Sequence, residues 1–122
     1  METMNILVGG TAEFNDYTEF IRGMGVAMSD LGQRDLHIYT LGPVNINNFT
    51  AEFCNKVSHS MAQRGRKVKF FRIPARQAQM NLSEYSWFGF FGEGRPSKTF
   101  YEADAEGVDC VQFRERYGKP NK

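Results

Sequence analysis

The sequence predicts an α/β fold: a Rossmann-like three-layer sandwich with a mainly parallel five-stranded sheet and helices on both faces. Short apolar runs alternate with longer segments of helical periodicity along the whole chain. Several of the apolar runs are continuous, which is typical of strands that are buried on both faces. Parallel neighbours need crossover connections, and the intervening helical segments supply them.

Five apolar runs are expected to form the strands. They cover residues 4–8, 36–41, 68–73, 87–91 and 109–113. The first run ends at Gly9-Gly10, the second at Gly42-Pro43 and the third at Pro74, and all three are typical turn or breaker signals. These boundaries give five strands of ordinary length.

Three segments with helical spacing lie between the runs, at residues 17–31, 50–64 and 96–106. Asp16 is expected to cap the first helix, and a glycine follows each predicted helix. Residues 44–48 are polar and rich in Asn, so a loop is expected there. The pattern assigns no element to residues 75–84. The 122 residues predict one domain over 1–114 and a polar C-terminal tail over 115–122.

Composition limits the classes of function. Lys and Arg number 15 against 14 Asp and Glu, so the broad basic field of a duplex-binding protein is not expected. Cys54 and Cys110 have no CxxC partner, and the interpretation is two reduced, buried thiols. His37 and His59 lack a second metal-type ligand at a telling spacing, so neither a metal nor another cofactor is expected.

The predicted location is the cytoplasm. No apolar run approaches the roughly 20 residues that cross a bilayer, and the opening residues lack the pattern of a signal peptide. No membrane contact is therefore expected. A homodimer is compatible with a small sheet of this class.

The ligand site is expected at the carboxyl ends of the strands, where open α/β sheets bind their ligands. Three turns with unusual chemistry arrive there, after the first, second and fourth strands. Their candidate ligand-binding residues are Gly9, Gly10, Thr11, Gly42, Asn45, Gly92, Gly94, Arg95, Ser97 and Lys98.

The turn after the fourth strand is the most informative of the three. Its glycines let the backbone approach a ligand, and the helix start that follows presents N–H groups to an anion. Ser97 adds a hydroxyl, while Arg95 and Lys98 add positive charge for a phosphate. The alternative interpretation is an ordinary glycine-bearing turn with solvated basic residues. No Walker A loop is present, since G-x-x-x-x-G-K-[ST] does not occur.

Two stretches of the chain resemble the SLOG superfamily, a Rossmann-like group that includes the YspA-related domains and the "lonely guy" phosphoribohydrolases. The first is ILVGG at residues 6–10 followed by FNDY at 14–17. The second is FGEGRPS at residues 91–97 followed by EADAEGV at 102–108. The resemblance implies a nucleotide-derived ligand between the first and fourth strand–helix turns, facing Gly9, Gly10, Gly94 and Ser97.

The hydrolase branch of that superfamily carries P-G-G-x-G-T-x-x-E, from which this chain departs. Pro96 stands at the third glycine, Ser97 at the Thr, and Phe100 where the catalytic Glu would be. The resemblance therefore implies ligand binding and gives no support for hydrolysis.

Three functions follow as hypotheses. The first is non-catalytic binding, by which the protein senses or sequesters a nucleotide or nucleotide-derived small molecule. The second is an enzyme that cleaves an N-glycosidic bond, with Glu13, Asp16 and Glu93 as the nearby carboxylates. The third is a scaffold that acts by protein–protein contact, such as a small viral or mobile-element protein, with Tyr85 or Tyr101 as exposed hot spots.

Overall fold

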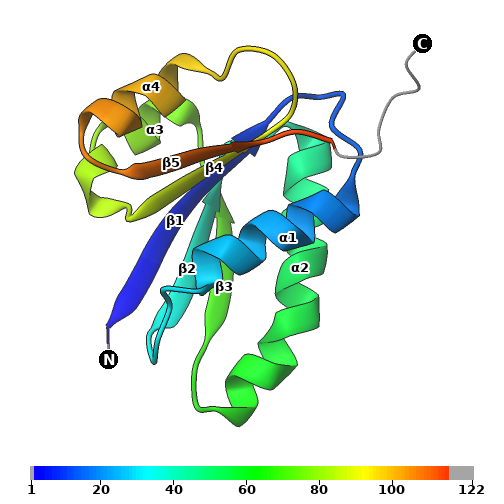
Figure 1. Cartoon of the computed structure of the whole chain (residues 1–122). Coiled ribbons are helices and arrows are strands. Elements are labelled where there is room, and N and C mark those ends of the chain that lie inside the picture. Colours follow the sequence, from blue (N-terminus) through cyan, green and yellow to red (C-terminus); the bar gives the residue numbers. More distant parts are fainter. Residues whose placement is uncertain (1, 116–122) are drawn as a thin grey trace.

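The computed structural model describes residues 2–115 and confirms the Rossmann-like α/β architecture (Figure 1). Its strands are β1 (Thr3–Gly10), β2 (Asp35–Thr40), β3 (Val68–Arg72), β4 (Trp87–Phe91) and β5 (Asp109–Phe113). They form one five-stranded sheet in the order β3-β2-β1-β4-β5, and every neighbouring pair is parallel. The chain builds outward from β1 to β3, then crosses to β4, so the strand order reverses between β1 and β4.

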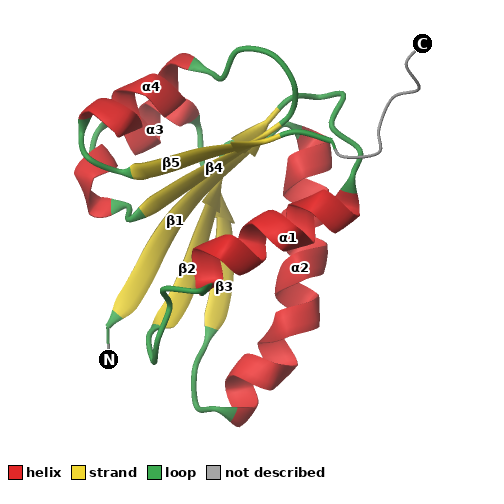
Figure 2. Cartoon of the chain, viewed as in Figure 1, coloured by secondary structure: helices red, strands yellow, loops and turns green. Residues whose placement is uncertain are grey.

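Helices cover the sheet on both faces (Figure 2). One face carries α1 (Tyr17–Met28) and α2 (Val44–Gln63). The other carries α3 (Ala75–Gln79), the 3-10 turn η1 (Leu82–Glu84) and α4 (Lys98–Ala105). Crossovers of this kind are what a parallel sheet requires.

The central strand β1 contributes side chains to two hydrophobic cores. Ile6 and Val8 point into the core beneath α1 and α2, while Leu7 points into the core beneath α3 and α4. All three side chains are fully buried. This alternation follows from the two-residue period of a strand. It fixes the sheet between its two helix layers.

The expectation of a loop over residues 44–48 is wrong, because α2 begins at Val44. Ile46 is fully buried and extends the apolar stripe of the helix by a turn. Pro43 precedes the first helical residue, with a φ of −71° that suits a helix start. The unassigned residues 75–84 form α3 and η1.

Of the predicted tail, residues 116–122 lie outside the described residues. Glu115 lies within them and has two polar contacts. Its backbone N–H donates to a Glu93 carboxylate oxygen at 3.1 Å, and its own carboxylate accepts from the Asn15 N–H at 2.7 Å. Within residues 2–115, no helix has both the length and the apolar character needed to cross a bilayer.

Candidate functional site

A crevice of about 300 Å³ lies at the carboxyl ends of β1, β2 and β4. This is the edge where open α/β sheets bind ligands, beside the reversal of strand order. We call it the glycine crevice. It is lined by Gly9, Gly10, Leu41, Gly42, Pro43, Ala75, Phe90, Ser97 and Thr99.

Glycine stands at three positions of this crevice, and the physical reason differs from one position to the next. A Cβ at Gly10 would lie 2.2 Å from the Phe91 carbonyl oxygen, so close packing requires glycine there. Gly42 has a φ of +85°, which favours glycine. At Gly9, a Cβ would lie 3.5 Å from the Phe88 ring, an ordinary contact. Neither packing nor backbone conformation therefore requires glycine at position 9. The absence of a side chain there leaves space above the floor of the crevice.

Two helices begin at the glycine crevice without a side-chain cap. The N-cap of α2 is Pro43 and that of α4 is Ser97, and neither makes a capping hydrogen bond through its side chain. The first N–H groups of a helix have no partner within the helix and carry a partial positive charge. Two such helix starts in one crevice favour an anionic group.

The floor of the crevice is apolar and its rim is polar. Phe90 is buried at 5% exposure, and its ring packs edge-on against Phe100 with centroids 6.1 Å apart. On the rim, the Thr99 hydroxyl accepts a hydrogen bond from the Gln79 amide at 3.2 Å, while Ser97 is exposed. An apolar floor with a few polar groups is the usual composition of a small-molecule site.

A second crevice, of about 170 Å³, lies at the same sheet edge. We call it the acidic crevice. It is lined by Thr11, Glu13, Phe14, Gly92, Glu93 and Glu115. Arg114 forms an ion pair with Glu93 at 3.6 Å, leaving the crevice with an excess of carboxylates.

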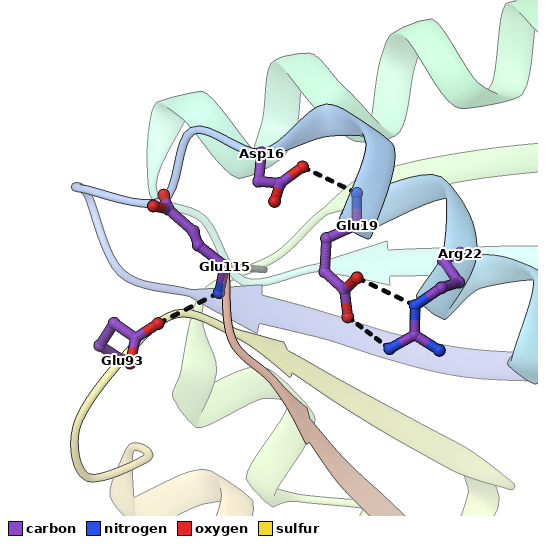
Figure 3. Close-up of polar contacts among 5 residues, drawn as sticks. All are labelled: Asp16, Glu19, Arg22, Glu93 and Glu115. Atoms are coloured by element: carbon purple, nitrogen blue, oxygen red, sulfur yellow. Dashed lines mark hydrogen bonds and ion pairs between the residues drawn. The ribbon is translucent and has the colours of Figure 1, made fainter. Parts of the chain in front are cut away.

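The helix start beside the acidic crevice is capped by the chain itself (Figure 3). The Asp16 carboxylate accepts from the Glu19 N–H at 3.0 Å, which confirms the predicted N-cap. Glu19 is buried, and its carboxylate accepts from the Arg22 guanidinium at 2.9 and 2.6 Å. The Asp16 carboxylate therefore already occupies a position that a bound anion would take at this helix start.

The loop after β1 and the turn after β4 are in direct contact, and this contact forms a wall between the two crevices. The Thr11 N–H donates to the Phe91 carbonyl at 2.9 Å. A Cβ at Gly92 would lie 2.4 Å from the Thr11 hydroxyl oxygen. The Asn45 amide donates to the carbonyls of Thr11 and Phe14 at 3.0 and 2.8 Å, and so holds the loop after β1 in place.

This wall divides the residues that the sequence proposed as one site. Gly9, Gly10, Gly42 and Ser97 line the glycine crevice, whereas Thr11 and Gly92 line the acidic crevice.

The other four candidates are not among the lining residues of either crevice. Asn45 is engaged with backbone carbonyls, and Arg95 is exposed. The Gly94 carbonyl accepts from the Gln112 amide at 2.8 Å. Lys98 is exposed and forms an ion pair with Glu102 at 3.8 Å.

Several residues that line the glycine crevice were not predicted from the sequence as ligand-binding residues. Leu41 and Phe90 lie within predicted strands and form its floor, while Pro43 and Thr99 lie at helix starts beside predicted residues. The sequence feature that could have identified these residues is their position next to the ends of predicted strands. Ala75 follows β3 in the segment to which no element was assigned.

The expectation that Tyr85 is an exposed hot spot is wrong, because only 7% of it is exposed. Its ring packs against Tyr39, with centroids 5.3 Å apart. Tyr101, the other candidate, is 51% exposed on α4.

Neither cysteine has the character of a nucleophile. Both thiols are free, and Cys54 is buried as expected, whereas Cys110 is only half-buried. Partial or full burial raises the pKa of each thiol to about 11. At neutral pH such thiols hold their protons, and the thiolate is the reactive form. Among residues 2–115, His, Cys, Asp and Glu form no group of three or more that is placed to hold a metal ion.

No protein-family model and no curated protein sequence matches this chain. Among solved structures, the universal stress protein UspA from Lactobacillus plantarum is similar over 93% of this chain and 99% of that one, at 13% identity and a TM-score of 0.41. The interpretation of the site therefore depends on the residues of this chain.

Proposed function

We propose that the glycine crevice binds a nucleotide or nucleotide-derived small molecule, which the protein senses or sequesters. The observation that carries the proposal is the meeting of two uncapped helix starts, those of α2 and α4, over an apolar floor. The helix starts suit a phosphate, and the floor formed by Leu41 and Phe90 suits a base or sugar. A volume of about 300 Å³ lies at the lower end of the range for small-molecule sites, roughly 300–1,000 Å³.

Binding is favoured over turnover by the chemistry of the lining. Cleavage of an N-glycosidic bond needs a placed general acid or base, and none of the crevice-lining residues is Asp, Glu, His or Lys. Glu13 and Glu93, two of the carboxylates considered for such a step, line the acidic crevice on the other side of the wall. Asp16 caps α1.

The resemblance to the SLOG superfamily supports the same crevice from a different direction. It assigns ligand contacts to Gly9, Gly10 and Ser97, and all three line the glycine crevice. The fourth residue that it assigns, Gly94, is not among the lining residues.

A thermal-shift assay tests the proposal. The panel comprises AMP, ADP, ADP-ribose and a cyclic nucleotide, with adenosine as the control that lacks phosphate. A ligand present at 100 times its Kd stabilises the folded state by about 2.7 kcal/mol, which raises the Tm by several degrees. We expect at least one phosphate-bearing compound to raise the Tm more than adenosine does.

A matched pair of variants locates the effect. Ser97→Glu places a carboxylate at the start of α4, where it repels an anionic ligand while remaining compatible with the helix. Thr18→Glu makes a similar change in the first turn of α1, beside the acidic crevice, at another exposed position. We expect only Ser97→Glu to abolish the thermal shift.

Three results would overturn the proposal of non-catalytic binding at this crevice. The first is a panel that leaves the Tm unchanged at millimolar concentration, and the second is a thermal shift that survives Ser97→Glu. The third is release of free base from a nucleoside monophosphate, measured by chromatography, which would identify an enzyme.

A further inference from the structure

Charge is unevenly distributed along this nearly neutral chain. Residues 53–83 contain seven of the 15 Lys and Arg residues and none of the 14 Asp and Glu residues. This segment includes most of α2, the edge strand β3, and α3. Its basic residues are Lys56, Arg64, Arg66, Lys67, Lys69, Arg72 and Arg76. The β3 edge of the sheet is therefore locally basic.

Aromatic rings accompany these cations on one face of β2 and β3. In the register of the two strands, His37 pairs with Lys69 and Tyr39 pairs with Phe71. The Phe71 ring stacks on Tyr39 with centroids 5.0 Å apart and an interplanar angle of 23°. It also meets His37 edge-on at 5.4 Å. Phe71 is 37% exposed, so the row of rings is open to solvent at its β3 end.

The helix layer on this side lies mainly over other strands. In Figure 2, α3 and α4 sit on the side of β4 and β5, whereas α2 covers β2 and β3 from the opposite face. Lys67 and Lys69 are exposed. We call the surface formed by His37, Tyr39, Lys67, Lys69 and Phe71 the aromatic–basic face.

A cavity of about 370 Å³ continues this face toward α3 and η1. Tyr39 belongs to both. Two tyrosines and three side-chain amides supply most of the lining, which comprises Asn5, Tyr39, Gln77, Met80, Asn81, Glu84 and Tyr85. Amides present donors and acceptors together, as the edges of nucleobases do.

We propose that the aromatic–basic face and its adjoining cavity bind single-stranded nucleic acid. Unpaired bases stack on exposed rings regardless of their sequence, and Lys residues beside those rings neutralise the backbone phosphates. Phe71 and Tyr39 provide the stacking surface here, and Lys67 and Lys69 provide the charge. The amide-lined cavity is suited to the edge of one base that is splayed out of the strand.

The competing occupants fit this face less well. The bases of a duplex are stacked inside the helix and cannot reach the rings, and the net charge of +1 gives no broad field for a duplex. An acidic edge of a second copy would pair with the cations but would leave the rings and the amides without a specific partner. Two carboxylates border the face: Asp35 accepts from the Lys67 N–H at 2.9 Å, and Glu84 accepts from the Asn81 amide at 3.0 Å.

Fluorescence anisotropy with oligonucleotides of about 12 residues tests the proposal, a length within the usual site sizes. The probes are oligo(U), oligo(dT) and a duplex of equal length, each at about 50 and 200 mM salt. We expect both single strands to bind more tightly than the duplex, with affinity falling as salt rises. A difference between oligo(U) and oligo(dT) would show whether the 2′-hydroxyl contributes.

Matched variants separate stacking from charge. Phe71→Ser is expected to weaken binding about fivefold or more, because stacking contributes about 1–3 kcal/mol per base, whereas Tyr101→Ser on α4 should have no effect. Lys69→Gln should weaken binding and reduce the salt slope by about 0.7. Lys56→Gln, an equal change of charge on α2, should change neither.

Several results would overturn the proposal. These are no binding of either single strand at about 50 mM salt, equal affinity for the duplex, or an affinity that Phe71→Ser and Lys69→Gln leave unchanged. A mass that rises with protein concentration and is restored to the monomer by Lys69→Glu would assign the face to self-association instead. Phe71→Ser and Lys69→Gln leave the glycine crevice unaltered, and Ser97→Glu leaves the aromatic–basic face unaltered, so failure of this proposal is distinguishable from failure of the proposed function.

Discussion

The glycine crevice and the acidic crevice lie at the same edge of the sheet, yet they are suited to opposite charges. The start of α1, beside the acidic crevice, is capped by Asp16, and the lining there carries Glu13, Glu93 and Glu115. The starts of α2 and α4, at the glycine crevice, have no side-chain cap, and its lining has no charged residue. A helix start attracts an external anion only where the chain has not already supplied its own.

The wall between the two crevices explains how they remain distinct. Gly10 pairs with Phe91 across the sheet, and the Thr11 N–H donates to the carbonyl of Phe91. Backbone from two distant segments is in direct contact there. Any side chain added to the wall must push the segments apart, so the wall should be the most sensitive part of this edge.

Among these predictions, Gly10→Ala is expected to have the largest effect on stability, because it disrupts the wall between the two crevices. Its Cβ would lie 2.2 Å from the Phe91 carbonyl oxygen and 2.9 Å from the Ile46 side chain. We expect the free energy of unfolding to fall by about 2–3 kcal/mol, as measured by urea denaturation. Gly25→Ala is the matched control, because nothing lies within 4 Å of its added Cβ. The control should stabilise α1 by about 0.5–1 kcal/mol, and equal losses in both variants would contradict the role of the wall.

The second prediction compares the helix starts themselves. Asp16→Ala removes the hydrogen bond to the Glu19 N–H and should cost about 1 kcal/mol of stability. Ser97→Ala removes no capping hydrogen bond, and we expect its cost to stay within about 0.5 kcal/mol. Urea denaturation of both variants measures the difference. A cost for Ser97→Ala that matches Asp16→Ala would mean that α4 is capped in solution and is less available to a ligand.

The sequence was sufficient for the fold class and for the order of the strands along the chain because these signals are local. The apolar runs of β1 to β5 and the helical spacing between them need no information about distant residues. Asp16 was recognisable as a cap for the same reason. The start of α2 was missed because Asn residues favour loops, although the apolar residues Ile46, Phe49 and Phe53 already had helical spacing.

The site was less predictable because its division depends on non-local packing. The sequence placed Thr11 and Gly92 with Gly9 and Gly10, and only the contact between the two bends separates them. The engagement of Asn45 with the carbonyls of Thr11 and Phe14 crosses more than 30 positions of the chain. Spacing within one segment contains no information about such a contact.

Cys54 and Cys110 lie on opposite faces of the sheet, so the reactivity of each thiol depends on a different helix layer. Cys110 lies beneath α4, and its thiol donates to the Phe100 carbonyl at 3.7 Å. Cys54 is buried on α2, in the core of the opposite face. Since the start of α4 forms part of the glycine crevice, a ligand bound there should hold α4 closed over Cys110.

The raised pKa of each thiol makes stability depend on pH at the alkaline end. An unfolded thiol loses its proton near pH 9.0, its ordinary pKa, whereas burial keeps the proton on the folded thiol until about pH 11. The unfolded state therefore binds fewer protons across that window, and unfolding becomes more favourable as pH rises through it. Urea denaturation between neutral pH and pH 11 should show this loss, and the Cys54→Ala and Cys110→Ala variants should each show less of it.

Thiol labelling of the same two variants, each of which retains one cysteine, measures the smallest effect. Labelling should be slow at neutral pH, because the thiolate is the reactive form and the raised pKa of each thiol keeps it protonated. A nucleotide that occupies the glycine crevice should slow the labelling of Cys110 severalfold and leave that of Cys54 nearly unchanged, because local opening of α4 is the step that it opposes. Equal slowing at both thiols would point to stabilisation of the whole fold and would remove the evidence for a ligand at the start of α4.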